Sequence, residues 1–470
     1  MSSKKPIETK VNERIPRRKK RGLHQQDRPV VEPNAAGIDV GAREMYVAIP
    51  PDRDSEPVRV FKTFTADLEC LVDWLVARGI TTVAMESTGV YWIPLYQMLE
   101  DRGVRACLVN ARHMKNVPGR RTDWHECQWL QYLHAAGLLR AAFRPEQEVC
   151  GVRTLLRHRN ELVRMAVQHV QHMQKALTQM NVHIHHVISD LTGLTGLAIV
   201  DAILSGERDA AKLAELRHRS IQADEETIRK SLEGDWREEH LFTLKQSRQM
   251  YIAYRNHIEA CDKKIAKLLG GFEPQVDIEL QPLPALAGPS RKRRTKGTGD
   301  FRFEVRAEAY KLFGLDVTRI PGLNELAIPI FSEVGRDLAA RFPTAGHFAS
   351  WLGLCPDNDK SGGQVLWTGV RRINNRAAQM FRMAASSLHH NRSPLGDFLR
   401  RMKAKLGPAA GITATAHKIA IIFYTLVTKQ IEYDDSIWAT RDEHRQKRFE
   451  QKLKRQARQL GYELVPVQPV

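Results

Sequence analysis

Hydrophobic positions in residues 34–145 follow two different periods in turn. Short apolar runs predict two strands about a glycine turn in 35–50, followed by strands at 58–64, 81–87 and 104–110. Segments of helical spacing predict helices at 68–79, 90–103 and 123–139. Three leading strands followed by alternating helices and strands are typical of an α/β domain with a mixed sheet.

The cleanest periodicity lies at 146–186. Apolar residues there follow a 3-4 spacing for five heptads, and only Arg159 interrupts it. A second stretch at 244–268 repeats the pattern, with short Gly-broken helical segments between the two. Sustained a/d positions predict a coiled coil, so 146–270 is a helical coiled-coil region. The two stretches pair within one chain as an antiparallel hairpin, between chains, or both.

The remaining segments differ in composition. Residues 1–33 are a basic arm predicted to be disordered, and 271–300 are a Pro- and Gly-rich linker. Residues 301–435 predict a mostly α-helical C-terminal domain, with a helix-hairpin-helix form at 317–335 and an irregular loop at 355–369. Residues 436–470 predict a charged helical tail.

Charge favours a polyanionic partner. Lys and Arg number 72 against 54 acids, which gives a net charge of +18 and leaves nucleic acid or an anionic membrane surface as candidates. No apolar run is long enough to span a bilayer, and the N-terminus lacks the apolar core of a signal peptide. The six cysteines are scattered without a C-x-x-C pair, which predicts reduced thiols in the cytosol and argues against a zinc cage.

Four acidic residues carry the candidate chemistry. Asp39 and Glu86 lie in runs that predict buried strands, where a carboxylate costs several kcal/mol unless it is paired or bound to metal. Asp123 and Glu126 are three positions apart and share one face of a helix. Taken alone, that pair is typical of a solvated helix face. Together the four predict a site for Mg²⁺, with Mn²⁺ as a substitute, of the kind that assists attack on a phosphodiester.

The motifs GIDVG, MESTGVYW and PGRRTDWHECQWLQYLHAAGLL resemble those of the bridge-RNA-guided DEDD transposases. This is the IS-one-ten insertion-sequence family, with its IS-eleven-eleven branch and the pilin-inverting recombinases. The resemblance extends over residues 35–435 and implies a RuvC-like, RNase H-type fold for 34–145, with the four acids as metal ligands. The sequence departs from the family at Glu126, where aspartate is usual; glutamate is one methylene longer and still binds Mg²⁺.

Ser361 is the second candidate. It precedes two glycines in a polar loop that, on local sequence, is typical of an ordinary turn, although such a backbone also lets a phosphate approach closely. The segment 320–433 resembles the family's C-terminal transposase domain, which implies that Ser361 is a nucleophile. A serine hydroxyl needs activation, and no local base is evident. The metal site, in the same or another protomer, is the expected source.

Basic residues and backbone N–H groups are the expected nucleic-acid contacts. The segment around Gly322 either presents N–H groups to a phosphate or forms a plain turn between helices. The arginines after Ser361 either clamp phosphates or form a solvated face. The predicted contacts are Arg120, Arg121, Arg291, Lys292, Arg293, Arg294, Gly322, Lys360, Arg371, Arg372 and Arg376.

The resemblance implies a transposase, that is, a DNA recombinase that excises and inserts its own mobile element. A structured guide (bridge) RNA encoded by the element directs it, donor and target DNA are its substrates, and Ser361 forms a phosphoserine link to DNA. Strand exchange needs several DNA cleavages within one assembly, which favours a dimer that assembles into a tetramer through the coiled coil. The expected location is the bacterial cytosol near the nucleoid, without a membrane partner. The alternatives are a metal-dependent Holliday-junction-type nuclease with water as nucleophile, and an RNA-binding scaffold.

Overall fold

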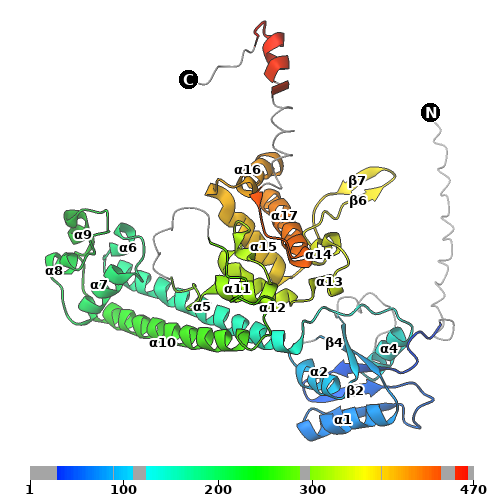
Figure 1. Ribbon diagram of the computed structural model, residues 1–470. Coiled ribbons are helices and arrows are strands. Elements are labelled where there is room, and N and C mark those ends of the chain that lie inside the picture. The colour runs from blue at the N-terminus through cyan, green and yellow to red at the C-terminus, as the bar shows by residue number, and fades with distance from the viewer. Residues whose placement is uncertain are drawn as a thin grey trace, which may run out of the picture. The chain divides into compact units, whose positions relative to one another are not determined.

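The computed structural model describes residues 29–87, 89–109, 123–285, 297–371, 373–435, 450–451 and 453–463, apart from the side chains at 359 and 360. The chain divides after Arg144 into two compact units, Met1–Arg144 and Pro145–Val470 (Figure 1). The predicted basic arm lies outside the described residues up to residue 28.

The first unit contains a five-stranded mixed sheet in the order β3–β2–β1–β4–β5. The antiparallel part is made of β1 (Ala35–Val40), β2 (Glu44–Ala48) and β3 (Val58–Lys62). Strands β4 (Thr82–Glu86) and β5 (Arg105–Val109) continue the sheet in parallel with β1. The predicted mixed α/β fold is confirmed, and the strand order is consistent with the expected RNase H-type fold.

Helices cover both faces of this sheet. Helices α1 (Thr65–Ala77) and α2 (Trp92–Asp101) pack on the face that carries Val83 and Met85. Helix α4 (Asp123–Ala135) packs on the opposite face (Figure 1). Leu130 and Leu133 of this helix form a buried cluster with Ala84 of β4. Side chains alternate along a strand, so a residue's position in β1 or β4 decides which helix layer it meets.

Two long helices dominate the start of the second unit. Helices α5 (Gln147–Gln179) and α10 (Glu238–Leu269) lie side by side along their length (Figure 1). They run antiparallel, because Arg159 meets Asp262 near one end and His169 stacks on Tyr254 further along. Of the alternatives left open by the sequence, the structure contains the hairpin within one chain. Supercoiling and pairing between chains stay predictions.

The interruption at Arg159 has a specific partner. Its guanidinium donates to both carboxylate oxygens of Asp262, with Nε–Oδ1 at 2.5 Å, and both side chains are almost completely buried. The guanidinium also donates to the backbone oxygens of Gly299 and Asp300. The 3-4 pattern of 244–268 predicts Cys261 as the seam position of α10 at this level. In the structure Asp262 takes the buried position, because the buried arginine needs a carboxylate opposite it, and Cys261 is half-buried beside it.

Short helices close the far end of this hairpin, near the end of α5 and the start of α10. They are α6 (Ile184–Val187), α7 (Leu194–Leu204), α8 (Ala210–Glu215) and α9 (Glu225–Ser231). Ile199, Leu213 and Ile228 join Leu177 and Leu244 in one buried cluster. The predicted short helices are confirmed here.

The rest of the second unit is mainly helical. An aromatic cluster centres on Phe348, with Phe381 and Phe423 in edge contacts. The elements are α11 (Val305–Phe313), the 3₁₀ turns η2 (Val317–Arg319) and η3 (Asn324–Leu326), α12 (Ala327–Val334), α13 (Leu338–Arg341), α14 (Ala345–Trp351), α15 (Arg376–Ser387), η4 (Leu388–His390), α16 (Pro394–Leu406) and α17 (Pro408–Lys429).

Among the described residues, α17 is the one helix long and apolar enough to cross a membrane by length and composition alone. Ala416, Ile419 and Phe423 on this helix are fully buried. They pack against α14, α15 and α16, so the apolar character of α17 is that of a core helix.

Two local predictions for this unit need correction. The segment 317–335 holds two single 3₁₀ turns before α12, so its first half is shorter than the helix expected of a helix-hairpin-helix. The predicted irregular loop is a β-hairpin instead, formed by β6 (Asp359–Ser361) and β7 (Gln364–Trp367). Gly362 and Gly363 have φ of +57° and +80°, the left-handed pair that closes a two-residue hairpin turn.

Candidate metal centre

Two of the candidate acids sit at the ends of neighbouring parallel strands. The register of β1 and β4 sets Gly37 opposite Ala84 and Ile38 opposite Met85, so Asp39 and Glu86 occupy the next positions. Each is two residues beyond a position that faces α4, and therefore lies on that same face of the sheet. Glu86 is buried and Asp39 is half-buried.

Gly37 brings α4 down onto this face. A Cβ at Gly37 would lie 2.2 Å from the backbone nitrogen of Gln131 and 2.4 Å from the backbone oxygen of Cys127. Only glycine fits here, because the helix backbone occupies the space of a side chain. The side-chain amide of Gln131 also donates, through Nε2, to the Ala35 carbonyl at 3.2 Å, which fixes the helix along β1.

The close crossing places the first turn of α4 beside the end of β1. Carboxylate oxygens of Asp39, Asp123 and Glu126 all lie within 4.8 Å of one another. Asp123 is exposed and Glu126 is half-buried. Asp123 and Glu126 thus share one helix face, and that face is turned toward Asp39. Glu86 lies on the same side of the sheet but outside this group of three.

The charges of this group call for a cation. Two unit charges 4.8 Å apart repel by about 1 kcal/mol in water and by about 3 kcal/mol near a protein surface. The N-terminus of α4 stabilises each acid of its first turn by about 0.3–1 kcal/mol. A set of carboxylate oxygens suits a hard divalent cation such as Mg²⁺, so the residues fit the predicted ion.

The surroundings include two residues that sequence reasoning missed. Tyr46 on β2 lies opposite Asp39 on β1 in the antiparallel pair. Its phenol pKa is raised, mainly by partial burial and to a smaller extent by the neighbouring carboxylates of Glu44, Asp123 and Asp39. Burial raises the pKa of the Cys127 thiol to about 12, with smaller contributions from Asp39 and Asp123. Cys127 is therefore an inert thiol beneath the acids. The two strands predicted about the glycine turn in 35–50 were the sequence signal that could have placed Tyr46 opposite Asp39.

Ser361 belongs to the second unit and ends β6. Residues 361–368 are all exposed, and Ser361 pairs with Gln364 across the turn. Leu366 follows Gln364 by two positions and shares its face of the hairpin, and this leucine is 68% exposed. The structure thus presents the serine on an exposed turn, where a large substrate has access.

The predicted nucleic-acid contacts fall into three groups. Arg371 donates to Ser350, and Arg376 is an exposed first residue of α15. At Gly322, with φ of +94°, a Cβ would lie 2.5 Å from the Ala384 carbonyl, so close packing on α15 accounts for this glycine. Outside the described residues lie Arg120, Arg121, Arg291, Lys292, Arg293, Arg294 and Arg372, and the side chain of Lys360.

Comparison with known protein families bears on both candidate sites. Residues 36–182 match the transposase family described as DEDD_Tnp_IS110, and residues 300–399 match the family described as Transposase IS116/IS110/IS902. The chain carries the two domains of an IS110-family transposase. The two matched segments cover a little more than half of the chain. No curated protein sequence matches it.

The matches cover every candidate catalytic residue. Asp39, Glu86, Asp123 and Glu126 fall within the DEDD transposase domain, and Ser361 falls within the second transposase domain. This is the IS-one-ten family to which the sequence motifs pointed. Transposase domains of this kind belong to enzymes that cleave and rejoin DNA, and a DEDD domain implies use of a divalent metal ion.

Proposed function

We propose that the protein is an RNA-guided DNA recombinase that moves its own element through a phosphoserine intermediate. The observation that carries the proposal is the convergence of Asp39, Asp123 and Glu126 on one face of an RNase H-like sheet. It is supported by the exposed Ser361 turn in the second transposase domain.

The acids hold the ion. Asp39, Asp123 and Glu126 supply oxygen ligands, and Glu86 supplies a further one or orients the others from the neighbouring strand. A bound Mg²⁺, or Mn²⁺ in its place, would stabilise negative charge on the phosphate oxygens during cleavage. Gly37 and the Gln131 amide hold α4 against β1, so these acids are positioned before the ion arrives.

Ser361 carries the covalent step. Its Oγ forms a bond to phosphorus while the bond from phosphorus to a deoxyribose oxygen breaks. The serine loses one proton and the leaving oxygen gains one, so the step balances without another reactant. The phosphodiester is exchanged rather than hydrolysed, and rejoining therefore needs no external energy source. This suits strand exchange better than attack by water.

Guidance and assembly complete the proposal. The net charge of +18 favours nucleic acid, and a structured RNA from the element supplies base recognition of donor and target DNA. Dimers assembling to a tetramer hold the several cleavages together. Specific cleavage should require RNA transcribed from the DNA beside the gene. Equal cleavage with a scrambled RNA would contradict guidance.

The decisive comparison uses the Ser361→Ala variant with labelled donor and target DNA, RNA and Mg²⁺. Wild-type protein should form a DNA adduct that survives denaturing electrophoresis, and Ser361→Ala should form none. Ser205→Ala, at another exposed serine of the second unit, is the matched control and should behave as wild type. Asp39→Asn should abolish both adduct and cleavage.

A metal-dependent junction nuclease is the second candidate. It is favoured by one observation: within the described part of the chain, the Ser361 hydroxyl has no hydrogen-bonded base to activate it. In that case water attacks, and the acids alone are needed. Cleavage that persists in Ser361→Ala and stops in Asp39→Asn would select the nuclease.

A further inference from the structure

A pocket of about 310 Å³ lies in the second unit between α5, α12 and the first turns of α15. Its apolar surface comes from Leu156, Pro329, Met380 and Met383. This volume lies at the lower end of the roughly 300–1,000 Å³ typical of small-ligand pockets, so the pocket suits one small group such as a single nucleotide.

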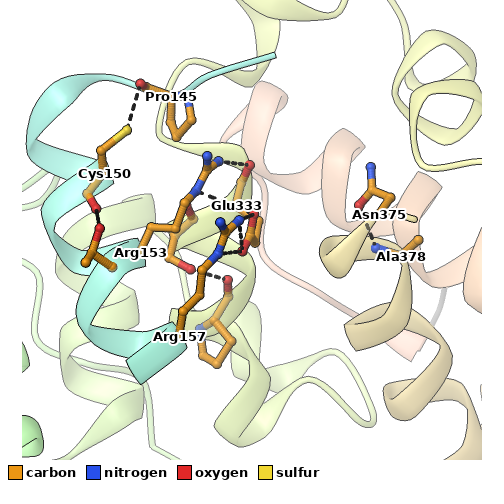
Figure 2. Close-up of polar contacts among 10 residues, drawn as sticks. Pro145, Cys150, Arg153, Arg157, Glu333, Asn375 and Ala378 are labelled. Atoms are coloured by element: carbon orange, nitrogen blue, oxygen red, sulfur yellow. Dashed lines mark hydrogen bonds and ion pairs between the residues drawn. The ribbon is translucent and has the colours of Figure 1, made fainter. Parts of the chain in front are cut away.

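A charged network forms one wall of this pocket. Glu333 on α12 is buried, and Arg157 on α5 donates to both of its carboxylate oxygens at 3.0 Å (Figure 2). Arg153 lies 3.5 Å from the same carboxylate and donates to the backbone oxygens of Ser332 and Glu333 (Figure 2). The Glu333 carboxylate is thus paired with the Arg157 guanidinium, which reduces its repulsion of an anion in the pocket.

The opposite wall is the start of α15. Asn375 caps the helix by accepting from the Ala378 amide at 3.1 Å (Figure 2). Arg376 follows at the first helical position and lines the pocket. Among the residues that the structure describes, its guanidinium has no hydrogen bond or ion pair. The pocket lining therefore carries two arginines, Arg157 and Arg376, against one glutamate.

Three amide side chains face the pocket as well. Asn160, Asn374 and Gln379 line it, and none of these amides bonds to a described residue. An amide donates and accepts at once, which matches the mixed edge of a nucleobase. Methionine and the guanidinium plane of an arginine accommodate the flat face of a base.

We propose that this pocket binds a single unpaired nucleotide, with the base between Met380 and Pro329 and its phosphate at Arg376. The unpaired nucleotide belongs to a bulge or junction in RNA or DNA; paired duplex is excluded because its bases are stacked. The site lies wholly within the second unit and does not depend on the serine chemistry. The amides act as readers of the base edge and the arginine as the phosphate contact.

The test measures binding by the full-length protein without cleavage. Fluorescein-labelled duplexes of DNA and of RNA are prepared fully paired or with one unpaired adenosine, and fluorescence anisotropy gives each affinity at fixed salt. Wild-type protein should bind at least one bulged probe about tenfold more tightly than its paired counterpart. Preference in the RNA arm, the DNA arm or both identifies the source of the nucleotide.

Matched variants separate this pocket from general charge. Asn160→Ala/Gln379→Ala should lose the preference for the bulge and keep wild-type affinity for paired duplex. Both positions are exposed on helices, where alanine is well tolerated. Gln249→Ala/Asn256→Ala, at exposed amides of α10 outside the pocket, should keep the preference.

Arg376→Gln tests the phosphate contact. It should weaken the bulged probe and lower the slope of log affinity against log salt by about one. Equal wild-type binding of bulged and paired probes overturns the proposal. So does an Asn160→Ala/Gln379→Ala variant that retains the preference, or an unchanged salt slope in Arg376→Gln.

Discussion

Replacing Gly37 with alanine should disable the acid cluster without touching an acid. The new Cβ would lie 2.2 Å and 2.4 Å from two backbone atoms of α4, where ordinary contact begins at 3.4 Å. Backbone atoms cannot rotate away, so α4 must move by about 1 Å. Overpacking of this kind costs about 1–3 kcal/mol of folding free energy. A misplacement of about 1 Å costs on the order of 100-fold in rate.

The assay has two readouts. Urea denaturation gives the loss in stability, and DNA cleavage under conditions where circular dichroism shows folded protein gives the rate and its Mg²⁺ dependence. Gly151→Ala is the control, because a Cβ there would lie 3.8 Å from the nearest side-chain atom, and alanine favours the helix. Wild-type stability and cleavage in Gly37→Ala would refute the argument that the close crossing positions the acids.

Three further predictions concern single side chains. Asp262→Ala should lower the free energy of unfolding by about 3–5 kcal/mol, because Arg159 becomes a buried unpaired charge. The double variant Arg159→Met/Asp262→Leu should have nearly wild-type stability. Urea denaturation midpoints measure both, and an equal loss of stability in the two variants would contradict the explanation. Cys127, with its thiol pKa raised to about 12, should resist iodoacetamide at pH 9 while the exposed Cys70 reacts, and equal labelling of the two would be inconsistent with this burial. The contribution of Cys127 to stability is present below the unfolded thiol pKa of about 8.5 and falls as pH rises toward 12. Glu126→Asp should retain strand cleavage at a higher Mg²⁺ requirement and Glu126→Gln should lose it, since only a carboxylate serves as ligand; full activity in Glu126→Gln would remove it from the ligand set.

The sheet of the first unit was predictable because its strands are short, mainly apolar segments bounded by glycine and polar residues. The same runs made Asp39 and Glu86 conspicuous, and the start of α4 at Asp123 follows from the helical period after it. The role of Gly37 was not predictable. It depends on which helix crosses β1, and the sequence pattern contains no sign of that crossing.

Two misses in the second unit have local physical causes. The hairpin at 359–367 carries the glycine pair that closes such turns, but its apolar residues Val365, Leu366 and Trp367 are exposed on both faces, so no buried alternation marks the strands. The shift of the α10 seam to Asp262 is set by Arg159, whose position opposite it is fixed only by the pairing of the two helices.

Mapping the residue that becomes linked to DNA distinguishes attack by Ser361 from attack by water. Cleavage is run in water enriched in oxygen-18, and the protein and the DNA ends are then analysed by mass spectrometry. A phosphoserine mechanism predicts a nucleotide covalently attached to Ser361 and rejoined DNA without the heavy isotope. Heavy oxygen in the new phosphate ends, with unmodified Ser361, would contradict it and would leave the Asp39, Asp123 and Glu126 cluster as the centre of a hydrolytic nuclease.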